Sequence, residues 1–215
     1  MAIYETEEQQ LEAVKQWWKA NGTSTIIGVA IGVAVIAGWN YWQDYKINQE
    51  NQASAIYDQL IKAAETDQKD AVDKLAIRLK EQFTDSHYAA YGGLFQAKFK
   101  VQQGDIAAAK DILKAIANGK DKELSHIAKI RLVKLMLASG EYEQGLKIIN
   151  EIDQAEAAKF SDNYDELIGD LYVAMDRLDE ARTSYQKALK NGYQSPLLQL
   201  KIDDLTAPEK SESKK

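Results

Sequence analysis

Three stretches of the chain repeat one pattern: QGDIAAAKDILKAIA (103–117), SGEYEQGLKIINEID (139–153) and MDRLDEARTSYQKAL (175–189). Each starts 36 residues after the one before it. Within each, a turn precedes an apolar residue, a small residue follows three positions later, and a larger apolar residue comes four positions after that. A helical pattern that recurs at a fixed period of this kind is typical of proteins that stack helical hairpins.

Helices are predicted before these turns, over residues 88–102, 125–138 and 163–174. A hairpin of two helices cannot bury an apolar face alone, so successive hairpins are expected to stack on a shared core. The small residue of each copy would let the two helices approach closely, which predicts packing roles for Ala109, Gly145 and Ala181. The chain is therefore predicted to be all-α, with a helical-hairpin solenoid. The alternative is an irregular helical bundle with chance periodicity.

Residues 20–43 contain no aspartate, glutamate, lysine, arginine or histidine. As a helix, this segment would extend roughly 36 Å, enough to cross a hydrocarbon core about 30 Å thick. Tryptophans lie near both of its ends, as in the aromatic belts of membrane helices: Trp17, Trp18, Trp39 and Trp42. An uncleaved transmembrane helix is predicted. The alternatives are a signal peptide, whose basic start the acidic first 19 residues lack, and a buried core helix.

The domain boundaries follow from these segments. We expect a cytoplasmic tail (1–20), a transmembrane helix (21–43), a juxtamembrane helical pair (44–86), the repeats (87–205) and a disordered tail (206–215). The spanning helix should continue past the membrane, because residues 39–91 contain neither glycine nor proline, and it should end at Glu65, because the polar cluster at 66–70 predicts a break. Lys15 and Lys19 precede the span and only Lys46 follows it closely, so the positive-inside rule places the N-terminus in the cytoplasm.

Composition argues against an enzyme. The chain has no cysteine, a net charge of −6 and no basic stripe, which leaves no thiolate metal site and no nucleic-acid surface. Its two histidines, His87 and His126, lie in different repeats and are read as solvated or helix-capping residues. No catalytic, cofactor-binding or metal-binding residue is predicted. The alternative of an exported enzyme on a helical scaffold has no residue set to support it.

Small residues recur inside the predicted membrane helix. Gly28 and Gly32 form a GxxxG pair, and Ala34 and Gly38 are expected to continue one small face at the same spacing. Close backbone packing drives helix association in lipid, where apolar side chains gain little from burial. A contact with another membrane helix is predicted here. The alternative is that these residues are merely tolerated.

The repeats resemble the tetratricopeptide repeat (TPR), whose period is 34 residues. The third copy matches best, with residues at the offsets of the family signature: Gly169, Tyr172, Ala181, Tyr185 and Ala188. Lys100 of the first copy stands where the family has tyrosine, and the period of 36 is slightly long. The resemblance adds Gly169 to the predicted packing residues and implies a TPR-like solenoid.

A fuller resemblance covers nearly the whole chain. The opening IYETEEQQLEAVKQWWKANG (3–22), the exit GWNYW (38–42) and the ending LLQLKIDDL (197–205) look like the YfgM family of ancillary subunits of the bacterial SecYEG translocon. The resemblance implies an inner-membrane protein with a periplasmic repeat domain. It also implies the translocon and a PpiD-type periplasmic chaperone as partners, with exported chains as further candidates. A cell-envelope assembly factor that does not associate with the translocon is the alternative.

The TPR resemblance also implies a binding surface, because the first helix of each repeat lines the concave groove in that family. Transferring this frame by the 36-residue period gives eight candidate groove residues: Tyr91, Leu94, Lys98, Ile127, Ile130, Lys134, Glu166 and Asp170. Such a surface would suit an amphipathic or extended segment. The alternative is that the apolar members belong to the core between repeats.

Overall fold

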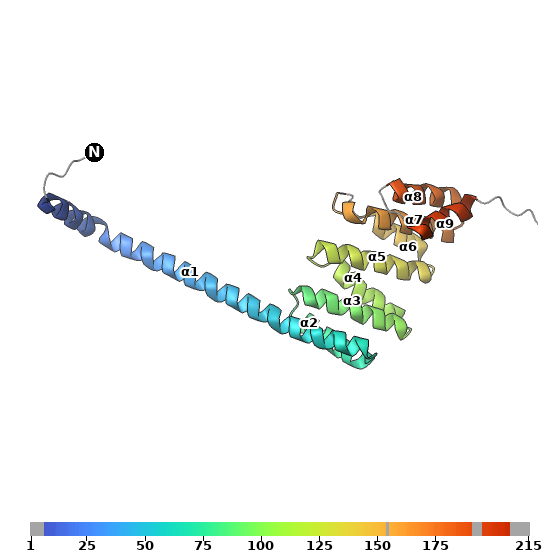
Figure 1. The fold of residues 1–215 in the computed structure, drawn as a ribbon, viewed down its shortest axis with the longest axis horizontal. Coiled ribbons are helices and arrows are strands. Elements are labelled where there is room, and N and C mark those ends of the chain that lie inside the picture. The colour runs from blue at the N-terminus through green and yellow to red at the C-terminus, as the bar shows by residue number, and fades with distance from the viewer. Residues whose placement is uncertain (1–6, 154, 191–194, 207–215) are drawn as a thin grey trace, which may run out of the picture. The chain divides into compact units, whose positions relative to one another are not determined.

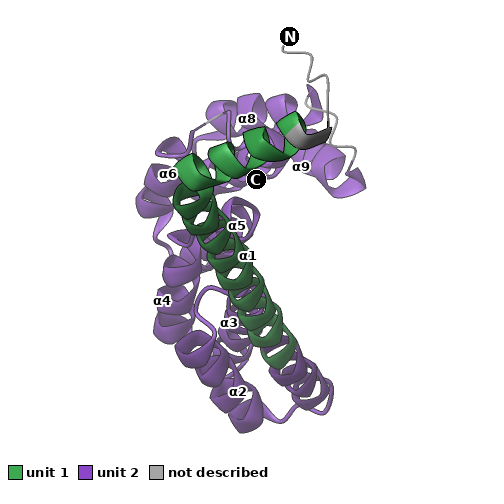
Figure 2. Ribbon diagram, turned by 90° about the vertical axis from the view of Figure 1, so that its left-hand side faces the viewer, with its two compact units in different colours: residues 1–52 green, residues 53–215 purple. Residues whose placement is uncertain are grey.

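The computed structural model describes residues 7–153, 155–190 and 195–206, and these are helical apart from short connections. Two compact units, Met1–Gln52 and Ala53–Lys215, divide the chain (Figures 1 and 2). The helices are α1 (Glu7–Glu65), α2 (Lys69–Gln82), α3 (His87–Gln102), α4 (Ile106–Ala117), α5 (Lys122–Ala138), α6 (Tyr142–Asn150), α7 (Ser161–Ala174), α8 (Leu178–Lys190) and α9 (Pro196–Thr206), with a 3-10 turn at Ala158–Phe160. The all-α prediction is confirmed.

The first unit consists of most of α1, whose apolar surface is open. The apolar window in this helix has a mean hydropathy of 1.7, and only 6% of it is buried. Ile26, Val33 and Ile36 are 59–63% exposed. Such exposure argues against a core helix, and α1 is long and apolar enough to be a candidate membrane span. The helix ends at Glu65, where the sequence placed its end.

The second unit is a stack of helical hairpins. Among the described residues, the pairs are the end of α1 with α2, α3 with α4, α5 with α6, and α7 with α8; α9 follows as a single helix. Figure 2 shows a curved stack with α2, α4 and α6 along its outer edge and α3 and α5 on the inner side. Within the pair expected at 44–86, the part of α1 from Ala53 onward and α2 form the first hairpin of the stack, and residues 44–52 belong to the first unit. The expected tail falls almost wholly on residues 207–215, which lie outside the described residues.

The same turn joins the helices of each described hairpin. One residue takes a positive φ: Asp67 (53°), Gly104 (82°), Gly140 (76°) and Asp176 (59°). The next residue donates its backbone N–H to the carbonyl five positions earlier, at 2.9 Å in every case: Gln68 to Ala63, Asp105 to Lys100, Glu141 to Met136 and Arg177 to Tyr172. This bond defines the Schellman motif, which ends a helix at a left-handed residue. The last three positive-φ residues stand 36 apart, which explains the period of the sequence.

Apolar side chains form four clusters along the stack of the second unit. The first three clusters draw on neighbouring hairpins, and the fourth joins α8 to α9. At the junction of α5 with α7, Val133 and Leu171 are both fully buried in the third cluster. The stack has no single centre, so each hairpin depends on the hairpins beside it.

The predicted packing residues lie at helix crossings. Ala109 and Ala181 are fully buried, and Gly145 and Gly169 are buried as well. The closest crossing is at Gly169, where a Cβ atom would stand 2.2 Å from Cε1 of Tyr185. At Gly145 the nearest atom, Cδ2 of Leu171, would be 3.1 Å away. At position 169, only glycine fits without displacing the ring of Tyr185.

We expect Asp176→Gly to stabilise the second unit and Gly140→Asp to destabilise it, each by about 1 kcal/mol, because a left-handed backbone is strained for residues with a Cβ. A Cβ at Gly140 meets no atom within 4 Å, so the exchange tests the backbone alone. Thermal unfolding of the full chain in micelles, followed by circular dichroism, measures both. Shifts of the same sign in the two variants would contradict the common turn.

We expect Gly169→Ala to lower stability by about 1–2 kcal/mol, although alanine favours helix over glycine by about 1 kcal/mol. Tyr185 is 2% exposed and its hydroxyl donates to Asp170, so the ring cannot move away easily. Gly145→Ala is the matched control, because only leucine methyl groups must yield there, and a smaller loss or a gain is expected. Equal melting temperatures of the two variants would refute the close crossing at Gly169.

Candidate functional site

The described residues contain no group of three or more histidine or acidic side chains placed to hold a metal ion. Three features remain as candidate sites: the small residues of α1, the predicted groove on α3, α5 and α7, and the contacts that join the hairpins.

The small residues of α1 are open to partners. A Cβ atom added at Gly28, Gly32 or Gly38 would meet no atom within 4 Å. The expectation of one continuous small face needs correction, however. At about 100° per residue, the pair Ala34 and Gly38 points about 120° away from the pair Gly28 and Gly32. The helix thus presents two separate small faces, and contact by either one stays a prediction.

The groove candidate Tyr91 belongs to an aromatic cluster. It is 40% exposed, and its ring centroid lies 5.9 Å from that of Tyr57 on α1 and 6.4 Å from that of Tyr88. Phe95 completes the cluster by an edge contact with Tyr57. Burial, and then Tyr91, Tyr88 and Asp58, raise the pKa of Tyr57, which keeps its hydroxyl protonated. The cluster offers a partner large apolar rings with polar tips.

Sequence analysis identified only Tyr91 of this cluster. Tyr88 and Phe95 lie three residues before it and four after it, which is the spacing of one helix face. An aromatic stripe on α3 could therefore have been predicted. Tyr57 comes from another helix, and its place beside them required the fold.

The other candidates on α3 and α5 differ in accessibility. Leu94 is 6% exposed and lies in the second core cluster, so it has no surface to offer a ligand. Lys98 and Lys134 are exposed. Ile127 and Ile130 are half-buried and pack against core clusters of the stack. The exposed candidates on these helices are therefore Tyr91 and the two lysines, while the isoleucines contribute mainly to the core.

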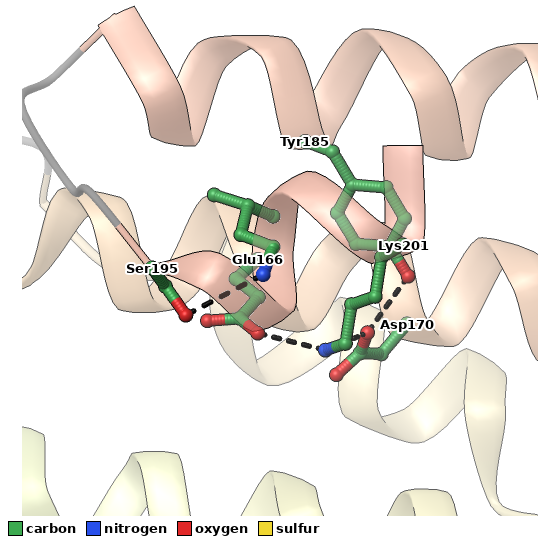
Figure 3. Close-up of polar contacts among 6 residues, drawn as sticks. Glu166, Asp170, Tyr185, Ser195 and Lys201 are labelled. Atoms are coloured by element: carbon green, nitrogen blue, oxygen red, sulfur yellow. Dashed lines mark hydrogen bonds and ion pairs between the residues drawn. The ribbon is translucent and has the colours of Figure 1, made fainter. Parts of the chain in front are cut away.

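The candidates Glu166 and Asp170 on α7 form ion pairs with α9 (Figure 3). The ammonium of Lys201 donates to a carboxylate oxygen of each at 2.7 Å, and the hydroxyl of Tyr185 donates to Asp170 at 2.8 Å. Burial alone would lower the pKa of Lys201, but its bonds to Asp170 and Glu166 outweigh burial and raise the pKa. Burial, then the bond to Asp170, raise the pKa of Tyr185. Glu166 and Asp170 thus pair with Lys201 within the stack. The 36-residue repeat pattern did not predict this lysine.

The two histidines have different roles. His87 is exposed, and its Nδ1 lies 2.8 Å from a carboxylate oxygen of Asp121 on the next hairpin. Ser86, not His87, caps α3 by accepting from the backbone N–H of Tyr88. His126 is 3% exposed, so its interpretation as a solvated or capping residue is wrong.

His126 fills the junction between α5 and α7. Its ring stacks on Phe160 at 5.0 Å, and its Nδ1 shares a hydrogen bond of 2.8 Å with the hydroxyl of Tyr164. Burial, followed by the charges of Lys129 and Lys122, lowers the pKa of His126 from 6.5, while Glu156 opposes the shift. The neutral imidazole is therefore the form that the fold accommodates.

We expect the second unit to lose stability as the pH falls below 6.5 because of His126. Its folded pKa lies below its unfolded pKa, so between these two values the unfolded chain binds more protons, with a slope of up to about 1.4 kcal/mol per pH unit. His126→Gln removes this titration and retains a polar side chain. Urea unfolding at about pH 7.5 and about pH 5.5 should show a larger loss for the wild-type chain. Equal losses would contradict a buried neutral His126.

Comparison with known proteins agrees with the fold. A model of the tetratricopeptide repeat-like domain family matches residues 15–207. No solved structure matches the chain significantly.

Several characterised proteins are similar along their whole length. The chain is 30% identical over 212 residues to the ancillary SecYEG translocon subunit of Haemophilus influenzae, covering 95% of this chain and 100% of the relative. The proteins of the same name from Aggregatibacter actinomycetemcomitans and Escherichia coli are 31% and 26% identical, over 95% and 96% of this chain and 100% of each relative. The protein described here therefore belongs to the family of ancillary SecYEG translocon subunits, and it carries a tetratricopeptide repeat-like domain.

Proposed function

We propose that the chain is a non-enzymatic accessory subunit of the SecYEG translocon, anchored in the bacterial inner membrane, whose TPR-like domain binds protein partners. The full-length similarity to ancillary SecYEG translocon subunits carries this proposal. It disfavours an envelope assembly factor that works apart from the translocon. The described surfaces suit protein contact, since they combine open small faces on α1 with exposed aromatic and charged side chains on the stack.

The proposal includes an orientation, with the N-terminus in the cytoplasm and the TPR-like domain in the periplasm. The lysine bias around the span supports it, because Lys15 and Lys19 precede the apolar segment and Lys46 follows it. Lys46 extends over the ring of Trp42, with its ammonium 4.3 Å from the ring centroid. An aromatic residue with a basic neighbour is suited to a membrane boundary.

In this proposal, two separate surfaces bind two different partners. The GxxxG face of α1 contacts a membrane helix of the translocon, because its glycines permit close backbone approach and meet no atom of the chain itself. The aromatic cluster around Tyr91 and the exposed Lys98 and Lys134 bind a PpiD-type periplasmic chaperone or an exported chain. Rings with polar tips and flexible cations suit an extended segment of mixed character.

The anchor is tested by co-purification of SecYEG with the tagged full chain from membranes in mild detergent. Gly28→Leu with Gly32→Leu should reduce the recovery of SecYEG, since added side chains separate the two helices. Ala34→Leu with Gly38→Leu is the matched control on the other small face and should leave recovery unchanged. Undiminished recovery with the first pair would place the association elsewhere, and absence of SecYEG from the wild-type sample would refute the proposed function.

The same purification tests the groove. Tyr91→Asp should reduce recovery of the chaperone without loss of SecYEG, because it places a carboxylate among aromatic rings that a partner would desolvate. Ile77→Asp on α2 is the control, since Ile77 is 41% exposed against 40% for Tyr91 but lies outside the aromatic cluster. Matching circular dichroism of both variants shows that the fold is intact. Equal recovery from the two would remove Tyr91 from the binding surface.

A further inference from the structure

A cavity of about 540 Å³ lies between the first two hairpins and α5. Helices α2, α3 and α4 and the start of α5 line it, together with the α2–α3 and α4–α5 connections. The volume is within the range of ligand-binding pockets, which span about 300–1,000 Å³. None of the eight candidate groove residues lines this cavity. It is therefore separate from the surface assigned above to the chaperone.

The apolar part of the cavity lining consists mostly of small side chains. Along α3 it comprises Ala89, Ala90 and Gly93, and along α4 Ile112, Ala115 and Ile116. His87 and Gln96 of α3 and the two connections add polar groups. Ala115 is exposed and stands at the opening. Close packing is the rule in protein interiors, so a gap of this size within a repeat stack requires an explanation.

The 36-residue period supplies the explanation. At the junction of α3 with α5 the chain has Ala90, Leu124 and Ala128, of which Ala90 and Leu124 line the cavity. The equivalent residues at the next junction, 36 positions on, are His126, Phe160 and Tyr164. Those three rings stack and bond with one another and fill the space between α5 and α7. The cavity is thus the place where the next junction holds aromatic side chains.

The lysine and aspartate side chains at the opening balance in number. Lys120 donates to Asp85 at 2.7 Å, and His87 lies 2.8 Å from Asp121. With Lys80, the charged lining comprises two lysines and two aspartates, beside His87. An anionic lipid or fatty acid finds no excess of positive charge here. Uncharged peptide groups, which both donate and accept, suit such a rim.

From this repeat comparison and this rim, we propose that the cavity binds an aromatic side chain presented by an extended segment of another polypeptide. The ring enters among Ala90, Ile112 and Ile116, and takes the place that His126 and its neighbours occupy at the next junction. The peptide backbone remains at the polar rim. This site would give the protein a second point of contact with a client or partner chain.

Methyl NMR of the full chain in lipid nanodiscs tests the proposal, with labelled isoleucine δ1 methyl groups. The probe is the capped peptide acetyl-Gly-Ser-Phe-Ser-Phe-Ser-Gly-amide. It should shift the signals of Ile112 and Ile116 saturably and leave that of Ile149, buried in another cluster, unchanged. The same peptide with alanine in place of both phenylalanines should cause no shift.

Two variants locate the binding. Ala115→Trp places a ring at the opening and should abolish the shifts. Ala107→Trp, at an exposed position of the same helix that does not line the cavity, should retain them. Ala90→Phe fills the cavity from its floor and should abolish the shifts at an unchanged or higher melting temperature.

Three results would overturn the proposal. The first is an absence of peptide-induced shifts in the wild-type chain. The second is retention of those shifts in Ala115→Trp and Ala90→Phe. The third is saturable shifting of Ile112 and Ile116 by oleate but not by the phenylalanine peptide, which would identify a lipid site instead.

Discussion

The left-handed turn between the two helices of a hairpin is the constraint on which the rest of the second unit depends. Directly after each positive-φ residue, the backbone N–H of the next residue donates a 2.9 Å hydrogen bond to the carbonyl five positions earlier. The positive-φ residues are Asp67, Gly104, Gly140 and Asp176. This turn ends one helix and sets the direction of the next. Because every turn has the same geometry, the two helices of each hairpin have the same relative orientation. Their apolar faces therefore meet the next hairpin in the same way. The period of the sequence, the positions of the small residues and the order of the core clusters all follow from this repetition.

The junctions between hairpins share a frame but differ in what fills them. Aromatic rings and a buried histidine fill the α5–α7 junction, and ion pairs of Lys201 join α7 to α9. At the α3–α5 junction, small side chains leave a cavity. Helix geometry therefore determines where a junction lies. The side chains at equivalent positions determine whether the junction is filled or leaves a cavity.

The sequence predicted much of the fold because its signals are local. The end of α1 at Glu65 and the turns at Gly104, Gly140 and Asp176 follow from glycine placement and helical periodicity. The turn at Asp67 was expected only as a break between helices and not as a repeat. It has no glycine and stands 37 residues before Gly104, so it falls outside the 36-residue frame.

Much less of the candidate sites could be predicted, because their residues meet only in three dimensions. His126 looked like a polar residue near a helix start, yet Phe160 and Tyr164 enclose it from another hairpin. Glu166 and Asp170 were predicted as groove residues, and the structure adds that Lys201 of α9 forms an ion pair with each of them. In a stack, the environment of a side chain is set by residues about one period away, and a pattern within one helix does not carry that information. Comparing equivalent positions of successive repeats recovers part of it.

Since stability in such a stack is nearly a sum of nearest-neighbour terms, a partner that fills the α3–α5 junction would stabilise the hairpins on either side of it more than those farther along.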